Sequence, residues 1–285
     1  MRSPIGWFGG KGNMVRKIIP ILTRIPHERY VEPFGGGASI LLAKKPKPVE
    51  VYNDLDHGLY DFFSVLSNPE LFDQFYRRVA VLPYSRQFYN EYRKEWKEEA
   101  DKIVRVAKWF LVARQSFSGA FGGSWSSSVT LTRRGMIATC SKWLSCIDML
   151  PQIHARLQRV QIENADFRTI LDRYDTPKTL FYCDPPYIPE TCKGGGYLYE
   201  MSAEDHQELV NLLLGLKGNV VLSGYNHEIY APLEKAKWTL YDFHTACYAS
   251  GRTRSSGLQG KGKALEKQGR IESLWVKPCA EGRLF

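Results

Sequence analysis

Short runs of β-branched and aromatic residues recur along the chain, and stretches with helical spacing of apolar residues separate them. Strand-like runs that alternate with helices predict an α/β fold rather than a β-sandwich. Seven runs are expected to form the strands of one sheet, at residues 29–34, 50–53, 160–164, 179–183, 219–224, 238–243 and 271–276.

A long segment between the second and third predicted strands contains no comparable series of strands. Residues 69–150 carry many aromatic and charged residues at helical spacing instead. We interpret this segment as an inserted, mostly helical domain. Residues 1–68 and 151–285 are then expected to form the domain that contains the sheet.

The inserted segment ends in a stretch rich in glycine and serine that nevertheless keeps the large aromatic residues Phe117, Phe121 and Trp125. Flexible surface loops usually lack such rings, so this stretch is a candidate binding surface. Polar and basic side chains flank it, namely Arg114, Gln115, Arg133 and Arg134.

A second irregular stretch, residues 250–270, has six basic residues and one acid, Glu266. The basic residues are Arg252, Arg254, Lys261, Lys263, Lys267 and Arg270. The stretch is either a solvated loop or a segment that becomes ordered on a phosphate backbone.

The composition favours a globular protein with a polyanionic partner. Of the 285 residues, 44% are hydrophobic, which is enough for a core, and the formal net charge is +9. No apolar run approaches the roughly 20 residues that span a bilayer, and the N-terminus lacks the apolar core of a signal peptide, so a cytoplasmic protein without membrane contact is expected. The six cysteines form no C-x-x-C pair, so neither a metal site nor disulfides are expected, and Cys183 is predicted to be core packing.

Three strand ends carry candidate ligand-binding residues. The first strand runs into the glycine-rich turn VEPFGGGAS, which allows a ligand to approach the backbone. Asp54, after the second strand, can accept both hydroxyls of a ribose, and Asp166 beside Phe167, after the third, can accept from the exocyclic amine of a purine. Taken singly, Asp54 and Asp166 are each more typical of a turn or a helix cap.

The fourth strand ends in TLFYCDPPY, in which two prolines remove two backbone donors and stop the strand. An acid, stiffened carbonyl groups and an aromatic ring remain at its carboxyl end. Asp184, Pro185, Pro186 and Tyr187 are therefore the candidate catalytic residues. The Asp184 carboxylate and the Pro185 carbonyl can accept hydrogen bonds from the two N–H groups of a planar amine, and Tyr187 can stack on the ring that carries the amine.

In order along the chain, GWFGGKG, VEPFGGGAS, YNDLD, the acid of ADF and YCDPPY resemble the motifs of the Dam-type (D12 class, alpha-group) DNA adenine N6-methyltransferases. The resemblance implies a Rossmann-like methyltransferase sheet, and the insertion resembles the target recognition domain of that family. It also implies S-adenosylmethionine as methyl donor, double-stranded DNA as substrate and roles in DNA methylation, including restriction-modification. We expect a monomer or a weak dimer on DNA.

By the same resemblance, nine residues line the pocket of the methyl donor: Trp7, Lys11, Glu32, Phe34, Gly36, Asp54, Asp166, Phe167 and Asp184. The glycine turn ends in Ala38 where many relatives have glycine, which is expected to narrow the pocket slightly. Because the donor is already activated, no metal is needed, but the target base must be flipped out of the duplex.

The loop with Phe117, Phe121 and Trp125 is a candidate source of the residue that fills the gap left by the flipped base. Arg114, Gln115, Arg133 and Arg134 are candidate readers of base edges and phosphates, and the 250–270 stretch is a candidate to track phosphates. The alternatives are methylation of cytosine N4, of RNA adenine or of a protein glutamine, and a DNA-binding relative that no longer catalyses.

Overall fold

All seven predicted strands lie in one sheet in the computed structural model, which describes residues 1–188, 199–246 and 269–278. The strand order is β5-β2-β1-β6-β7-β9-β8. The strands are β1 (Arg29–Glu32), β2 (Val49–Asn53), β5 (Gln161–Glu163), β6 (Thr179–Cys183), β7 (Asn219–Gly224), β8 (Thr239–Ala246) and β9 (Gly269–Val276). β1 ends two residues earlier than predicted, because Pro33 cannot donate to a neighbouring strand.

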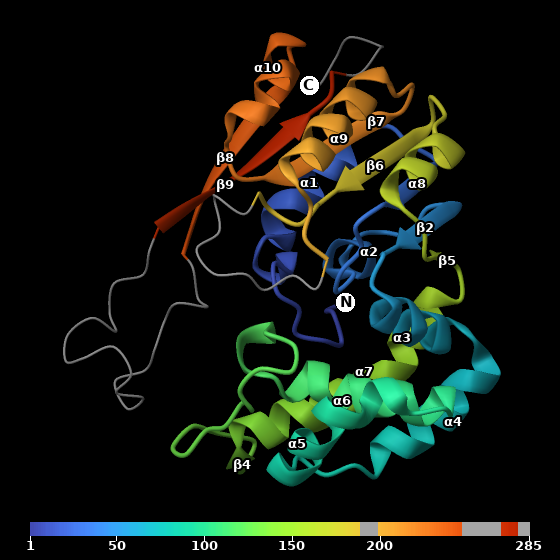
Figure 1. Cartoon of the computed structure of the whole chain (residues 1–285), viewed down its shortest axis with the longest axis vertical. Coiled ribbons are helices and arrows are strands. Elements are labelled where there is room, and N and C mark those ends of the chain that lie inside the picture. Colours follow the sequence, from blue (N-terminus) through green and yellow to red (C-terminus); the bar gives the residue numbers. More distant parts are fainter. Residues whose placement is uncertain (189–198, 247–268, 279–285) are drawn as a thin grey trace.

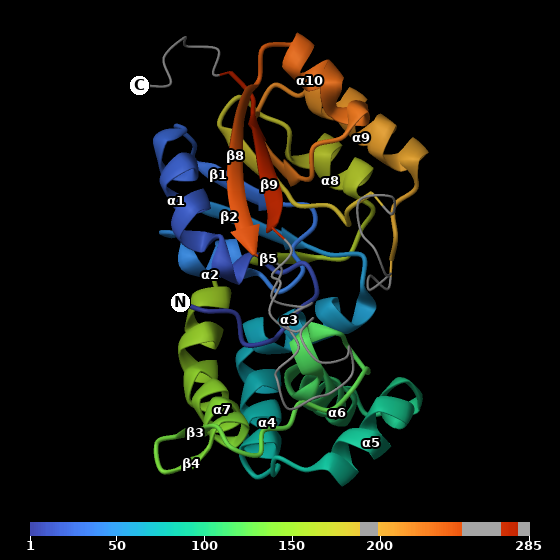
Figure 2. The ribbon, with the colours of Figure 1, turned by 90° about the vertical axis from the view of Figure 1, so that its left-hand side faces the viewer.

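The sheet is parallel from β5 to β7 and antiparallel at β9 and β8. Figure 2 shows α1 (Val15–Arg24) and α2 (Ser39–Ala43) on one face. The opposite face carries α8 (Phe167–Tyr174), α9 (Ala203–Gly215) and α10 (Ala231–Lys235). Successive strand residues alternate between the two cores, and Cys183 packs in one of them, as predicted.

The segment between β2 and β5 is mostly helical, as predicted, and lies below the sheet in Figure 1. Its helices are α3 (His57–Ser67), α4 (Pro69–Ala80), α5 (Arg86–Glu95), α6 (Lys102–Gln115) and α7 (Ala138–Leu157), and a small hairpin joins β3 (Thr132–Arg133) to β4 (Met136–Ile137). α7 runs through the predicted domain boundary at residue 150. Its apolar face continues into the same core that α1 and α2 cover.

Side-chain caps account for where α3, α4, α5 and α6 begin, whereas α7 has no such cap. Asp56, Asn68, Ser85 and Asp101 each accept a hydrogen bond from a backbone N–H of the following helix. Pro69 occupies the first turn of α4, where no backbone donor is needed. The 3₁₀ turns are η1 (Lys11–Asn13), η2 (Trp96–Glu98), η3 (Phe117–Gly119) and η5 (Glu228–Tyr230).

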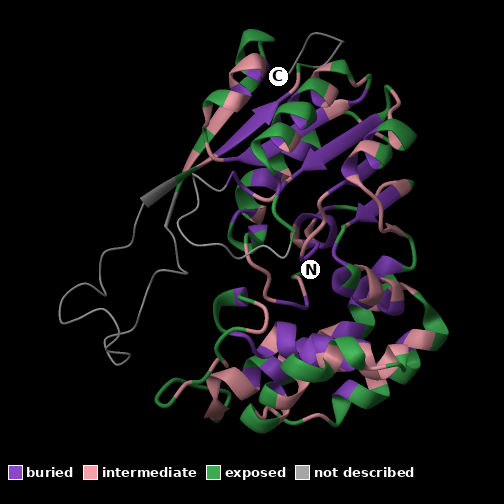
Figure 3. Ribbon diagram, in the orientation of Figure 1, coloured by how far each residue is buried: buried purple, intermediate pink, exposed green. Residues whose placement is uncertain are grey.

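A buried ion cluster ties α7 to the sheet. Glu50 on β2 is bonded by Lys44, and its second oxygen lies 2.6 Å from the guanidinium of Arg156 on α7. Removing Glu50 would leave two buried cations without their counterion, and breaking a buried pair in this way typically costs about 3–5 kcal/mol. Figure 3 shows buried residues both in the sheet and in the helices below it, and one apolar core contains residues of both.

Five of the six basic residues predicted to track phosphates lie outside the described residues, namely Arg252, Arg254, Lys261, Lys263 and Lys267. Within the described part of the chain, no helix combines the length and the apolar character needed to cross a membrane. In the same part, histidine, cysteine and acidic side chains form no group of three that could hold a metal ion.

Candidate active site

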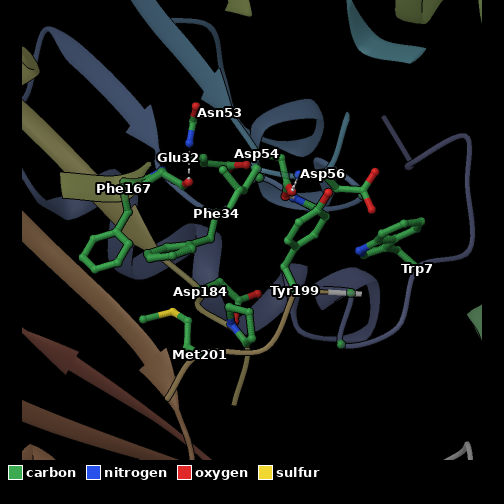
Figure 4. A pocket seen from close by; sticks show the side chains of 18 of the residues that line it. Trp7, Glu32, Phe34, Asn53, Asp54, Asp56, Phe167, Asp184, Tyr199 and Met201 are labelled. Carbon is green, nitrogen blue, oxygen red and sulfur yellow. Dashed lines mark hydrogen bonds between the residues drawn. The ribbon is translucent and has the colours of Figure 1, made fainter. Parts of the chain in front are cut away.

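A cavity lies at the carboxyl ends of β1, β2, β5 and β6, and the predicted donor residues surround it. All nine line it: Trp7, Lys11, Glu32, Phe34, Gly36, Asp54, Asp166, Phe167 and Asp184. Figure 4 shows Phe34 and Phe167 at one end of the cavity, Trp7 at the other end and Asp184 between them. Ligands of open parallel sheets bind at this edge, so the placement is that of a binding site.

The glycine turn after β1 has no room for side chains. A Cβ on Gly35 would lie 2.2 Å from the ring of Tyr52, and Gly36 has a left-handed φ of +47°. The Tyr52 hydroxyl donates to the Gly36 carbonyl at 2.8 Å and braces the turn from below. Ala38 also has a left-handed φ, of 53°, but it is fully buried and does not line the cavity, so the expected narrowing does not occur.

Asp54 holds the turn and faces the cavity at once. Its carboxylate accepts from the backbone N–H of Gly36 at 2.8 Å and of Asp56 at 2.9 Å. Burial raises the pKa of Asp54 to about 6, although these two backbone donors oppose the shift. Asp54 is thus a turn residue, and its position on the wall still allows it to bind hydroxyl groups.

Sequence reasoning missed Asn53, which fastens three strand ends together. Its side-chain amide donates to the carbonyls of Pro33 and Ala165, at 2.8 and 2.9 Å, and its side-chain oxygen accepts from the Ala165 N–H. Asn53 lines the cavity together with further residues that were not predicted, among them Asp56, Tyr199 and Met201. Its place within YNDLD was a signal, since a polar residue at a buried strand end needs such partners.

The rings of Phe34 and Phe167 form an apolar part of the wall, with centroids 5.3 Å apart. Asp166 beside it caps α8, accepting from the Arg168 N–H at 2.8 Å, and it also pairs with the Arg168 guanidinium. Both interpretations of Asp166, as a cap and as a wall residue, therefore describe the same side chain.

Glu32 is a buried acid on the cavity wall. It accepts from the Tyr30 hydroxyl at 2.7 Å and is 2% exposed. Burial raises its pKa to about 8, against the opposing effects of Tyr30 and Lys44. Glu32 is therefore mostly protonated at neutral pH and can donate a hydrogen bond.

Asp184 forms an ion pair with Lys11, whose Nζ lies 2.7 Å from Oδ1. Burial raises the pKa of Asp184 to about 6, while Lys11 opposes the shift. Pro186 lines the cavity, and Pro185 is buried in the same turn. The structure thus brings the acid of the Asp-Pro-Pro-Tyr motif and the lysine of GWFGGKG to one wall.

The aromatic loop of the insert is folded onto the protein rather than extended from it. The hydroxyl of Tyr89 binds the Gly123 carbonyl at 2.8 Å, and the Phe117 N–H binds the Ser124 carbonyl at 2.8 Å. Phe121 packs against Trp7, with ring centroids 6.1 Å apart, and lines the cavity. The loop therefore contributes to the cavity wall.

The residues of this loop that were predicted to face DNA differ in exposure. Phe117 is 48% exposed, whereas Trp125 is half-buried and donates its indole N–H to Gln115. Gln115 is fully buried, and its side-chain nitrogen donates to the carbonyl of Pro83, between α4 and α5, at 3.4 Å. The prediction that Gln115 reads a base edge therefore does not fit this structure.

The three predicted arginines all lie in the insert but differ in exposure. Arg133 and Arg134 are exposed in the hairpin of β3 and β4, next to the exposed apolar residues Val129 and Leu131. Arg114 is half-buried near α7, and its guanidinium donates to the Lys142 carbonyl at 3.4 Å. The hairpin thus combines cations and apolar side chains at one surface.

Comparison with known proteins gives two findings. The profile of the D12 class N6 adenine-specific DNA methyltransferases matches residues 7–239. The Type II methyltransferase M.MjaIII of Methanocaldococcus jannaschii is 23% identical over 206 residues, which cover 64% of this chain and 68% of that protein.

Proposed function

The chain belongs to the D12 class of N6 adenine-specific DNA methyltransferases, and we propose that it binds S-adenosylmethionine in the cavity at the carboxyl edge of the sheet. Membership of the class makes the chain an enzyme that methylates the N6 amine of adenine in DNA. The reaction needs a methyl donor. The identity of the donor and the residues that hold it are our proposal.

The chemistry of the wall supports this donor. Asp54 and the glycine turn suit a ribose, the rings of Phe34 and Phe167 suit a purine, and Lys11 offers a cation to a carboxylate. When bound, S-adenosylmethionine supplies an activated methyl group on a sulfonium. Asp184, which we propose binds the adenine amine, also lines this cavity. This is the single observation that carries the proposal, because the methyl donor and the amine must lie next to each other for the transfer.

Asp184 and Pro185 are proposed to act on the adenine amine. The amine is a poor nucleophile because its lone pair is delocalised into the ring. The Asp184 carboxylate and the Pro185 carbonyl each accept a hydrogen bond from one N–H group of the amine. These two bonds localise the lone pair on the nitrogen, directed towards the methyl group. The stiffness of Pro185 and Pro186 keeps the two acceptors in register, and Tyr187 stacks on the base.

The insert is proposed to hold the duplex while the base is flipped out. Phe117 is the best candidate to fill the vacated space, because it is the exposed ring of its loop and Gly119, two residues on, lines the cavity. Arg133 and Arg134 are proposed to contact the DNA, with Arg114 as a less exposed third contact. Double-stranded DNA is therefore the proposed substrate form.

The proposal is tested by methyl transfer from isotopically labelled S-adenosylmethionine to duplex DNA, single-stranded DNA, RNA and protein. We expect label in duplex DNA, as N6-methyladenine on hydrolysis. Label in cytosine, RNA or protein would replace the proposal by one of those activities. Binding of duplex DNA without any transfer would identify a non-catalytic relative.

A further inference from the structure

Tyr187 is held by a residue outside its own motif. Its phenol O–H donates to Oε2 of Glu272 at 2.6 Å, and the two residues are 85 positions apart in the chain. Tyr187 is 6% exposed, so bulk water has little access to the ring. A hydrogen bond to a carboxylate is roughly twice as strong as one between neutral groups.

The direction of β9 explains how Glu272 reaches the motif. β9 is antiparallel to β7, with Ser273 opposite Gly224, the last residue of β7. The first residues of β9 therefore lie at the edge where β6 and β7 end. Glu272 meets the turn after β6 because of this topology.

The surrounding charges connect Glu272 to the catalytic acid. Nζ of Lys11, which is bonded to Asp184, lies 4.6 Å from the centre of the Tyr187 ring. Burial lowers the pKa of Lys11, but Asp184 first and Glu272 second raise it, and the net shift is upward. One buried cation is thus bonded to Asp184 and lies over the ring that Glu272 holds.

A second acid next to β9 makes a different kind of contact. Asp242 on β8 accepts from the hydroxyl of Ser273 at 2.6 Å, which joins two neighbouring strands. The Glu272 contact instead joins the sheet to the Asp-Pro-Pro-Tyr turn. Its effect is therefore on the ring of Tyr187 rather than on pairing of the strands.

We propose that Glu272 is a positioning residue that fixes the ring of Tyr187 for stacking on the target adenine. The inference rests on the proposed function, in which Tyr187 meets the flipped base. A bond at the phenol oxygen restrains the ring about both of its side-chain torsions. The base then meets a preorganised surface, so less freedom is lost when it binds.

The test is a double-mutant cycle with Glu272→Ala and Tyr187→Phe in the full chain, assayed by methylation of a duplex that carries the enzyme's site. Each single variant is expected to lower kcat/KM for DNA about tenfold, as loss of a hydrogen bond to a charged group does, and the double variant no further. Calorimetry is expected to give wild-type affinity for S-adenosylmethionine. Glu272→Gln, which keeps an acceptor oxygen, is expected within about threefold of wild type.

Asp242→Ala is the matched control, because it removes a neighbouring carboxylate that binds β9 but not Tyr187, and wild-type kcat/KM is expected. Independent losses that multiply to about 100-fold in the double variant would overturn the inference. So would a wild-type rate for Glu272→Ala, or a Glu272→Gln variant as slow as Glu272→Ala, since the charge would then matter rather than the bond.

The inference can still be tested if the Glu272→Ala variant folds poorly. Tyr187→Phe and Glu272→Gln retain the shape of the site, and a wild-type rate for Tyr187→Phe would overturn the inference by itself. A wild-type enzyme that methylates no DNA would overturn the proposed function as well. The other adverse outcomes leave the proposed function intact.

Discussion

The cavity and the hairpin of the insert differ in how far their ionisable groups are buried. Lys11 and Glu32 in the cavity are 5% and 2% exposed, whereas Arg133 and Arg134 in the hairpin are exposed. Burial raises the pKa values of Asp54 and Asp184 to about 6. We therefore expect groups in the cavity to act through short hydrogen bonds in a poorly solvated space, and those on the hairpin to act through charge that solvent and salt screen.

The difference predicts how each region responds to substitution. Loss of one preorganised polar group in the cavity affects a single chemical step strongly and is insensitive to salt. Loss of one cation on the hairpin affects all DNA binding weakly and changes its salt dependence. The substitutions below test this division.

The largest effect is expected for Asp184→Ala. Loss of the acceptor for the adenine amine should lower the rate of methyl transfer roughly 10³-fold. Binding of duplex DNA should stay within a few-fold of wild type, because the carboxylate acts on the amine rather than on phosphates. Single-turnover kinetics and gel-shift titrations measure the two quantities.

Asp184→Asn is the matched variant, since it keeps an acceptor oxygen in the same turn and is expected to lose less than Asp184→Ala. Near wild-type turnover of purified Asp184→Ala would remove Asp184 from the mechanism. A large loss of DNA affinity in the same variant would contradict the division between the two regions.

Asp54→Ala is expected to weaken binding of S-adenosylmethionine by about 1–3 kcal/mol through lost hydrogen bonds to the ribose. Part of the loss comes from the turn, because the Gly36 N–H loses its partner. Isothermal titration calorimetry measures the affinity. Asp61→Ala, which removes an acid on the next helix that pairs with Lys102 and Arg105, should bind the donor normally, and equal affinities of both variants would refute the ribose assignment.

Much of the cavity could be predicted from the sequence, because its residues sit at strand ends and short motifs fix their spacing. The seven strands are confirmed, and all nine predicted donor residues surround one cavity. Glu272 could not be predicted, because only the antiparallel direction of β9 brings it to Tyr187.

The insert was harder to interpret from residue types. Phe117, Phe121 and Trp125 look alike in the sequence, and the structure leaves Phe117 exposed while packing the other two. Gln115 is buried, and Trp125 and Pro83 supply the hydrogen-bond partners of its amide. A sequence pattern does not show which side of an irregular loop faces the core.

The third prediction concerns pH. In the proposed mechanism Asp184 accepts from both Lys11 and the amine and must therefore be ionised, and burial raises its pKa to about 6. We expect kcat/KM for DNA to fall about tenfold per pH unit below this value. Lys11→Met removes the cation that lowers the Asp184 pKa, so its acidic limb should lie at higher pH than that of wild type. Identical acidic limbs would mean that another group controls the rate.

The smallest effect is expected from neutralising Arg133 and Arg134 together. If both contact phosphates, the slope of log affinity against log salt should fall by about 2, because roughly 0.9 counterion is released per contact. Affinity should fall alike for all duplexes, and donor binding should not change.

Arg77→Ala with Arg78→Ala is the matched control, since these arginines belong to α4 of the same insert, away from the hairpin. Equal slopes for the two double variants would mean that the basic surface for DNA lies elsewhere, with the stretch containing Lys261, Lys263 and Lys267 as the next candidate. A loss confined to one sequence would instead assign the arginines to base edges.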